Sequence, residues 1–178
     1  MNIYFDMDGV LAKYDRDAYV GELPRFRQPG AHYFRDLPPD ERAVEALRIL
    51  EETNEERDGL FVLSSLTNTG SIFLEQYRDK TLWLEDQFGA VARRPMLVPS
   101  VTNKRDVAEF LMHRRLTVND VLIDDYNPNL EDWRDHGGMA VKYLNGINSA
   151  DSFSGPIIDL SMSARNIVEM LEALRYAQ

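Results

Sequence analysis

Side chains that can bind metal or phosphate follow the short apolar runs of this sequence. In chain order they are Asp6, Asp8, Ser64, Ser65, Lys104, Asp124 and Asp125. Asp6 and Asp8 stand two residues apart, so on an extended chain they point to the same side. Carboxylates gathered in one place repel each other, and a hard divalent cation relieves that repulsion. Because Mg²⁺ prefers oxygen ligands, these acids predict a magnesium cofactor rather than zinc.

The same residues suit phosphoryl transfer. A carboxylate is ionised at neutral pH, so Asp6 can attack phosphorus directly and form an aspartyl-phosphate. Asp8 can protonate the leaving oxygen and later take a proton from the attacking water. A hydroxyl and an ammonium group can bind the phosphoryl oxygens. The predicted catalytic residues are Asp6, Asp8, Ser64 and Lys104, and the predicted phosphate-binding residues are Ser64, Ser65, Lys104 and Gly9.

Each feature also has an ordinary structural explanation. The run Asp6–Gly9 is a common turn sequence, and Asp124-Asp125 before Tyr126-Asn127-Pro128 is suited to capping a helix. A serine pair after a strand is commonplace, and a lysine at the start of a helix is usually a solvated charge. The catalytic interpretation is favoured because all four features occur together, each at or just past the end of a predicted strand.

The elements that must position these residues alternate between strands and helices. Predicted strands lie at residues 2–5, 60–63, 96–98, 121–123 and 139–143. Four helical patterns lie between and after them: Ala43, Leu47 and Leu50 after Pro38-Pro39-Asp40; Leu82–Phe88, ended by Gly89; Val107, Phe110 and Leu111 facing inward after Asn103; and Ile167, Met170, Leu171 and Leu174 after Ser161 or Ser163. Residues 145–156 are predicted to be a surface loop. The alternation predicts an α/β fold with a three-layer, Rossmann-like parallel sheet.

The composition limits the kinds of protein that this chain can be. With 178 residues and 44% hydrophobic content, the sequence fits one domain over residues 1–178. The absence of cysteine excludes disulfides and thiolate zinc sites. A net charge of −10 argues against stable nucleic-acid binding. Without a signal peptide or a run of about 20 apolar residues, we expect a cytoplasmic protein that binds no membrane. The residues suited to phosphoryl transfer predict a small-molecule phosphomonoester as its substrate.

At these residues the chain resembles phosphatases of the haloacid dehalogenase-like superfamily. The segment Tyr4–Leu11 is similar to the first motif of that superfamily, and Ile123-Asp124-Asp125 is similar to the fourth. Ser64 matches the second motif and Lys104 the third. The first motif is the most specific of these matches.

The resemblance implies a role for each matched acid. Asp6 would be the nucleophile, and Asp8 the general acid and base. Magnesium would be held by Asp6, by the backbone carbonyl of Asp8, and by Asp125, with Asp124 close by. The fold implied is the Rossmann-like fold of that superfamily.

Within the superfamily, the chain is most similar to the 5'(3')-deoxyribonucleotidase family. Pro29-Gly30 with Phe34–Pro38 resembles the segment that leads that family back from its cap, and Lys80–Gly89 resembles its Lys…Trp…Phe-Gly stretch. The resemblance implies dephosphorylation of nucleoside 5'-monophosphates, preferably deoxy. The helical cap of that family is reduced here to residues 12–28. This predicts an open site unless a second subunit of a homo-oligomer covers it.

Other residues have weaker claims. The cap-like segment supplies Tyr14, Arg16, Tyr19, Arg25, Phe26 and Arg27. One interpretation is that the arginines bind phosphate and the aromatics stack on a base. The other is that the aromatics pack on the core and the arginines stay solvated. Asn127 and Asn129 either orient the acid pair or form a turn. Surface or packing roles are predicted for His32, His113 and His136, which show no ligand spacing, and solvent exposure for Arg93-Arg94.

Three functions are compatible with these residues. The first is a phosphomonoesterase acting on nucleoside monophosphates, which the family resemblance favours. The second is a phosphatase of another class, acting on sugar phosphates or phosphorylated macromolecules, which the short cap favours. The third is a non-catalytic binding module on the same fold. Against the third stands the presence of both Asp6 and Asp8, because a relative that had lost activity would be expected to lack one of them.

Overall fold

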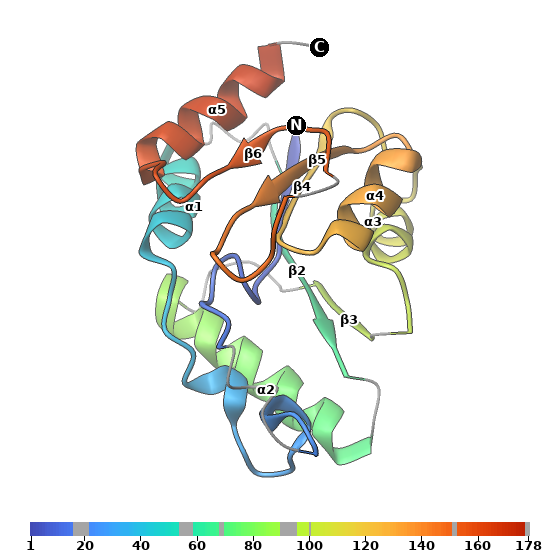
Figure 1. The fold of residues 1–178 in the computed structure, drawn as a ribbon. Coiled ribbons are helices and arrows are strands. Elements are labelled where there is room, and N and C mark those ends of the chain that lie inside the picture. Colours follow the sequence, from blue (N-terminus) through green and yellow to red (C-terminus); the bar gives the residue numbers. More distant parts are fainter. Residues whose placement is uncertain are drawn as a thin grey trace.

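A six-stranded parallel sheet forms the centre of the molecule, with helices on both faces (Figure 1). The computed structural model describes residues 1–15, 22–53, 59–67, 70–89, 96–99, 101–150 and 153–176. The strands are β1 Asn2–Phe5, β2 Gly59–Leu66, β3 Met96–Pro99, β4 Asp120–Asp124, β5 Met139–Tyr143 and β6 Ile157–Ile158. The helices are α1 Glu41–Thr53, α2 Gly70–Phe88, α3 Lys104–Met112, α4 Asn127–Asp135 and α5 Ala164–Tyr176, with short 3-10 turns η2 Arg25–Arg27 and η3 Tyr33–Arg35. The predicted Rossmann-like α/β class is confirmed.

The order of the strands brings the predicted site residues together. The order is β3-β2-β1-β4-β5-β6, and every neighbouring pair is parallel. Phe5 at the end of β1 lies opposite Val62 of β2 and Ile123 of β4. Asp6 therefore leaves the sheet at the same edge as Asp124. The strand order also reverses beside β1, and ligands of open parallel sheets bind at such a point.

Alternate residues of the central strand pack into different layers. Ile3 and Phe5 belong to a cluster that includes Leu47 of α1, Trp83 of α2 and Leu171 of α5. Tyr4 belongs to a second cluster on the other face, with helices α3 and α4 (Figure 1). A strand buried on both faces is largely apolar, which is why residues 3–5 of β1 form an unbroken apolar run in the sequence.

The predicted strands agree with the structure except at the edge of the sheet. The first and fifth predictions match β1 and β5, and the middle three are extended by one or more residues. β6 was missed because it has only two residues. None of the described helices is long and apolar enough to cross a membrane.

Helix α2 is much longer than the predicted 82–88 segment. Its inward face carries the polar side chains Gln76, Asp79 and Lys80, all of them buried. The apolar periodicity that reveals a helix is therefore absent from its first half. Its predicted end is confirmed, since Gly89 follows with φ of +80° and donates its backbone N–H to Glu85.

The predicted inward face of α3 was wrong. Phe110 is 73% exposed and Leu111 46% exposed, whereas Val107 is partly buried. The residues that α3 buries are Lys104 and Ala108. A buried lysine that serves the site has displaced the apolar stripe that the periodicity suggested.

Candidate active site

Asp6 and Asp124 share one buried lysine. Lys104 Nζ lies 2.8 Å from Asp6 Oδ1 and 2.7 Å from Asp124 Oδ2, so its ammonium group bridges the two carboxylates. The backbone N–H of Met7 also donates to Asp6 Oδ1, at 2.7 Å. Burial lowers the pKa of Lys104, but Asp124 and Asp6 outweigh it and the net shift is upward. Lys104 is therefore positively charged, and it touches the predicted nucleophile directly.

The acid pair at the end of β4 is held from several directions. Asp124 is fully buried and accepts hydrogen bonds from the backbone N–H of Tyr126 at 2.8 Å and from Asn129 Nδ2 at 3.0 Å. The suggestion that Asn129 orients the acid pair is confirmed. Asn127 accepts a hydrogen bond from Lys142 Nζ at 2.6 Å. The same ammonium group donates to the backbone carbonyl of Asp125.

The loop after β5 supplies two amide groups that hydrogen-bond to the Asp125 carboxylate. Asn145 Nδ2 donates to Asp125 Oδ2 at 2.7 Å, and Asn148 Nδ2 donates to the same oxygen at 2.6 Å. Asn145 also donates to the backbone carbonyl of Gly9 at 3.0 Å. The sequence predicts a surface loop here and indicates no function for it. The only available signal was a pair of asparagines just beyond the end of a predicted strand.

Three of the carboxylates suit a divalent cation. One oxygen from each of Asp6, Asp124 and Asp125 lies within 4.8 Å of the others, and all three residues are buried. Burial and the neighbouring acids raise the pKa of Asp6 to about 8, although Lys104 opposes the shift. Within the described residues, Lys104 is the only lysine or arginine in ion-pair contact with this group, so three acids have a single cationic partner among them. A hard, oxygen-binding ion such as Mg²⁺ fits this donor set. The Asp8 carboxylate is not part of the group.

Mg²⁺ is expected to raise the melting temperature more at alkaline than at acidic pH. The pKa of Asp6 is raised to about 8, and burial beside Asp124 raises that of Asp125 to about 7. The folded, metal-free site thus keeps protons that the unfolded chain releases near pH 4. Its stability falls as the pH rises from there towards those values. Mg²⁺ must displace the same protons, so its binding strengthens over that interval.

Thermal melts with millimolar Mg²⁺ or with a chelator, at about pH 6 and about pH 8.5, measure the effect. An equal shift at both pH values, or no shift at either, would contradict a magnesium site at these acids.

We expect Asn148→Ala to weaken Mg²⁺ binding by about 10- to 100-fold, the range found when a group that orients a metal ligand is removed. The substitution removes one of the two amides that fix Asp125 Oδ2. The Mg²⁺ concentration that gives half the maximal melting shift is the measurement. Asn119→Ala, at an exposed turn, is the matched control and should titrate like the unmodified protein. Coincident curves for both variants would show that Asn148 does not support the site.

Asp8 is held by a buried lysine that no sequence motif of the site predicts. Lys80 of α2 is fully buried and donates to the Asp8 carboxylate, to Ser64 Oγ at 2.9 Å and to the backbone carbonyl of Ser65 at 2.7 Å. Its ammonium group lies 4.3 Å from the centre of the Phe34 ring. The other oxygen of Asp8 is buried, without a hydrogen-bond partner among the described residues. Such an acceptor is suited to a donor on a bound ligand.

Ser64, Ser65 and Gly9 occupy different positions relative to the cavity. Ser65 lines it, as its predicted role requires. Ser64 is fully buried, and its hydroxyl accepts from Lys80 rather than lining the cavity. Gly9 has φ of +83°, and a Cβ there would lie 2.3 Å from Asp125 Oδ2. The close approach of Gly9 to Asp125 therefore requires glycine.

A cavity of about 530 Å³ opens beside the acids. Asp6, Asp8, Asp125 and Lys104 line one part of it, and Tyr14, Phe26 and Phe34 line another. The lining also includes hydrogen-bonding side chains, among them Arg27, Ser65, Thr67, Gln76, Thr102, Asn103, Asn129 and Asn148. Gln76 binds the cap-like segment, because its Nε2 donates to the backbone carbonyl of Phe26 at 2.5 Å. The described part of the 12–28 segment thus forms a wall of the cavity.

The remaining candidates divide between packing and surface positions. Tyr14 and Phe26 pack on the core, which confirms the packing interpretation, and they also line the cavity. Stacking of these rings on a base stays a prediction. The Arg25 guanidinium lies 5.8 Å from the Tyr33 ring centre, outside the cavity lining. His113 and His136 are exposed, as predicted. Arg16, Tyr19, Arg93 and Arg94 lie outside the described residues.

Solved structures with the same architecture are hydrolases. No family model and no curated protein sequence matches the chain. The chain is similar to D,D-heptose 1,7-bisphosphate phosphatase from Burkholderia thailandensis, at 12% identity and a TM-score of 0.61, over 97% of this chain and 98% of that one. The phosphatase of the same name from B. bronchiseptica, complexed with magnesium and phosphate, is 14% identical with a TM-score of 0.59, over 97% of this chain and 98% of that one. A haloacid dehalogenase-like family hydrolase from Xanthomonas campestris is 9% identical with a TM-score of 0.62, over 99% of this chain and 96% of that one.

The fold and the site together define a Rossmann-like α/β protein with an acidic centre at the carboxyl ends of β1 and β4. Its fold is that of the haloacid dehalogenase-like hydrolases, and the similarity covers nearly the whole of both chains. The fold expected from the sequence resemblance is therefore confirmed. The resemblance to deoxyribonucleotidases stays a prediction.

Proposed function

We propose that the chain is a Mg²⁺-dependent phosphomonoesterase of the haloacid dehalogenase-like type, acting through an aspartyl-phosphate on Asp6. The observation that carries the proposal is the buried group of Asp6, Asp124 and Asp125 around Lys104, open to a cavity at the carboxyl edge of the sheet. Phosphatases among the structural neighbours, one of them complexed with magnesium and phosphate, agree with this class of reaction.

Asp6 and Asp8 divide the reaction between them. The Asp6 carboxylate attacks phosphorus, forming an oxygen–phosphorus bond while the bond to the ester oxygen breaks. Asp8 gives a proton to that ester oxygen and then takes one from the water that hydrolyses the aspartyl-phosphate. Lys104, paired with Asp6, reduces the repulsion between carboxylate and phosphate. Mg²⁺, when bound, supplies further neutralisation of the phosphoryl charge.

The substrates we propose are nucleoside 5'-monophosphates, preferably deoxy. Support comes from the sequence resemblance at residues 29–38 and 80–89, and from the aromatic wall of Tyr14, Phe26 and Phe34. Aromatic side chains stack on nucleobases regardless of base identity. In this proposal residues 12–28 serve as a reduced cap on a single domain, and the described part of the segment supplies Tyr14 and Phe26.

A sugar phosphate is the second candidate substrate. The cavity lining favours it in one respect, because hydroxyl, amide and guanidinium groups there are suited to binding sugar hydroxyls. Two of the structural neighbours are named as heptose bisphosphate phosphatases. The two candidates differ in whether the leaving group is recognised by the aromatic wall or by the polar groups.

Phosphate release from a substrate panel tests both candidates. The purified protein, with millimolar Mg²⁺, is given deoxynucleoside and nucleoside 5'-monophosphates alongside sugar phosphates. We expect the highest kcat/KM with the deoxynucleotides. Faster release from sugar phosphates would replace the first candidate with the second. No release from any compound would refute the enzymatic proposal.

A further inference from the structure

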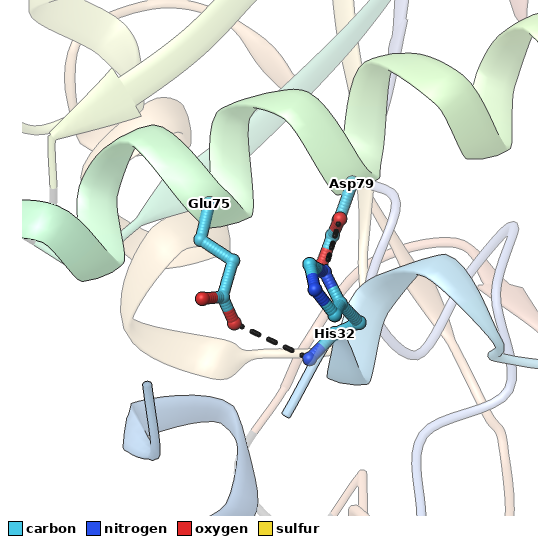
Figure 2. A group of neighbouring side chains, drawn as sticks. All are labelled: His32, Glu75 and Asp79. Atoms are coloured by element: carbon cyan, nitrogen blue, oxygen red, sulfur yellow. Dashed lines mark hydrogen bonds and ion pairs between the residues drawn. The ribbon is translucent and has the colours of Figure 1, made fainter. Parts of the chain in front are cut away.

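His32, Glu75 and Asp79 form a second group of possible metal ligands, separate from the acids at the strand ends. One nitrogen or oxygen from each lies within 4.8 Å of the others. Figure 2 shows the His32 ring facing Asp79, with Glu75 beside the backbone of His32. His32 Nδ1 lies 3.1 and 3.3 Å from the two oxygens of Asp79. Glu75 and Asp79 come from α2, whereas His32 precedes η3.

No lysine or arginine among the described residues pairs with the carboxylate of Asp79, whose ionisable partner is His32. Asp79 is 3% exposed, and within the described residues its only hydrogen-bond partner is the imidazole of His32. Lys80, next along the helix, donates instead to Asp8. A buried carboxylate is costly unless a cation compensates it. The His32 side chain is 55% exposed, so this pair is accessible to an ion from solvent.

The donor atoms suit a transition metal rather than magnesium. Imidazole nitrogen with carboxylate oxygen is a ligand set of zinc and its neighbours, bound at about 2.0–2.2 Å. At that length two ligands of one tetrahedral ion stand about 3.3 Å apart, close to the separation of His32 Nδ1 from the Asp79 oxygens. Both Glu75 oxygens accept backbone N–H groups, from Gly30 at 2.7 Å and His32 at 3.2 Å. Each oxygen retains a lone pair for a metal.

We propose that His32, Glu75 and Asp79 bind one divalent ion of the zinc class. Two carboxylates and a neutral imidazole balance its charge, and the exposed side leaves a position for water. The ion would tie the segment before η3 to helix α2. That segment leads directly into Phe34, which lines the cavity, and α2 supplies Lys80. The site would therefore fix one cavity wall against the helix that holds Asp8.

Zinc titration by calorimetry tests the proposal, with millimolar Mg²⁺ present to occupy the acids at the strand ends. We expect one zinc ion per chain, and His32→Gln to weaken its binding by more than about tenfold, since even a residue that only orients a metal ligand has that effect. His136→Gln is the matched control. His136 also pairs with an acid, Asp132 at 3.4 Å, but belongs to no group of three possible ligands within the residues that the structure describes. The His136→Gln variant should bind zinc with the same affinity as the unmodified protein.

Cobalt substitution identifies the ligands independently. Co²⁺ should give visible absorption bands that disappear in His32→Gln and in Asp79→Asn, yet persist in Asp6→Asn. Circular dichroism checks the fold, and the exposed position of His32 makes His32→Gln the less disruptive change. Unchanged zinc affinity in His32→Gln, or no zinc bound at micromolar concentration, would overturn the proposal. Phosphate release is not measured, so this outcome is independent of the proposed enzymatic function.

Discussion

Replacement of Asp6 by asparagine is expected to abolish phosphate release, by about a thousandfold or more, because an amide is not a nucleophile at phosphorus. The fold should survive, since the two side chains have nearly equal volume. The asparagine oxygen can still accept the Met7 N–H, and Lys104 keeps its contact with Asp124. Phosphate release at saturating substrate and Mg²⁺, with a thermal melt of the same sample, measures both effects.

Asp86→Asn is the matched control for that experiment. Asp86 carries an exposed carboxylate that pairs with Arg35, away from the cavity lining. The substitution is the same aspartate-to-asparagine change, and the Asp86→Asn variant should keep full activity. If Asp6→Asn retained even a tenth of the rate, Asp6 would not be the nucleophile. If both variants lost activity together, the assay would be reporting general damage rather than loss of a catalytic group.

The acids of the site could be located from the sequence because strand ends are local features. β1 is a short apolar run followed at once by Asp6, and β4 is another followed by Asp125. Parallel strands bring their carboxyl ends to one edge, so the rule for parallel sheets was sufficient to place these residues together. The pairing of Phe5 with Ile123 shows that the two ends are adjacent. Lys104 was identified in the same way, just beyond β3.

The residues that support those acids could not be found in this way. Lys80 reaches Asp8 from a helix 72 residues further along the chain, and Asn148 reaches Asp125 across 23 residues. No local pattern encodes such contacts. In α2 the site also conceals the helix, because a buried face of polar residues has no apolar period. In α3 the apolar spacing predicts that Phe110 faces the core. Phe110 is exposed instead, and the helix buries Lys104.

Lys80→Met is expected to destabilise the fold strongly. Lys80 is fully buried, and its removal leaves the largely buried Asp8 carboxylate with the hydroxyl of Ser64, at 3.5 Å, as its one remaining side-chain partner in the described part of the chain. Breaking a buried ion pair on one side usually costs about 3–5 kcal/mol. We expect a loss near the lower end, about 3 kcal/mol, because the Asp8 side chain keeps 18% exposure. Urea denaturation of the metal-free protein measures the change in the free energy of unfolding.

The double variant Asp8→Asn/Lys80→Met separates the ion pair from simple packing. Removing both charges leaves no unpaired carboxylate, so the double variant should be more stable than Lys80→Met alone by at least about 1 kcal/mol. Lys13→Met, at an exposed lysine, should change stability by less than about 0.5 kcal/mol. If the double variant were as unstable as the sum of the two single ones, Lys80 would act by filling space. Its contact with Asp8 would then not explain why a lysine is buried there.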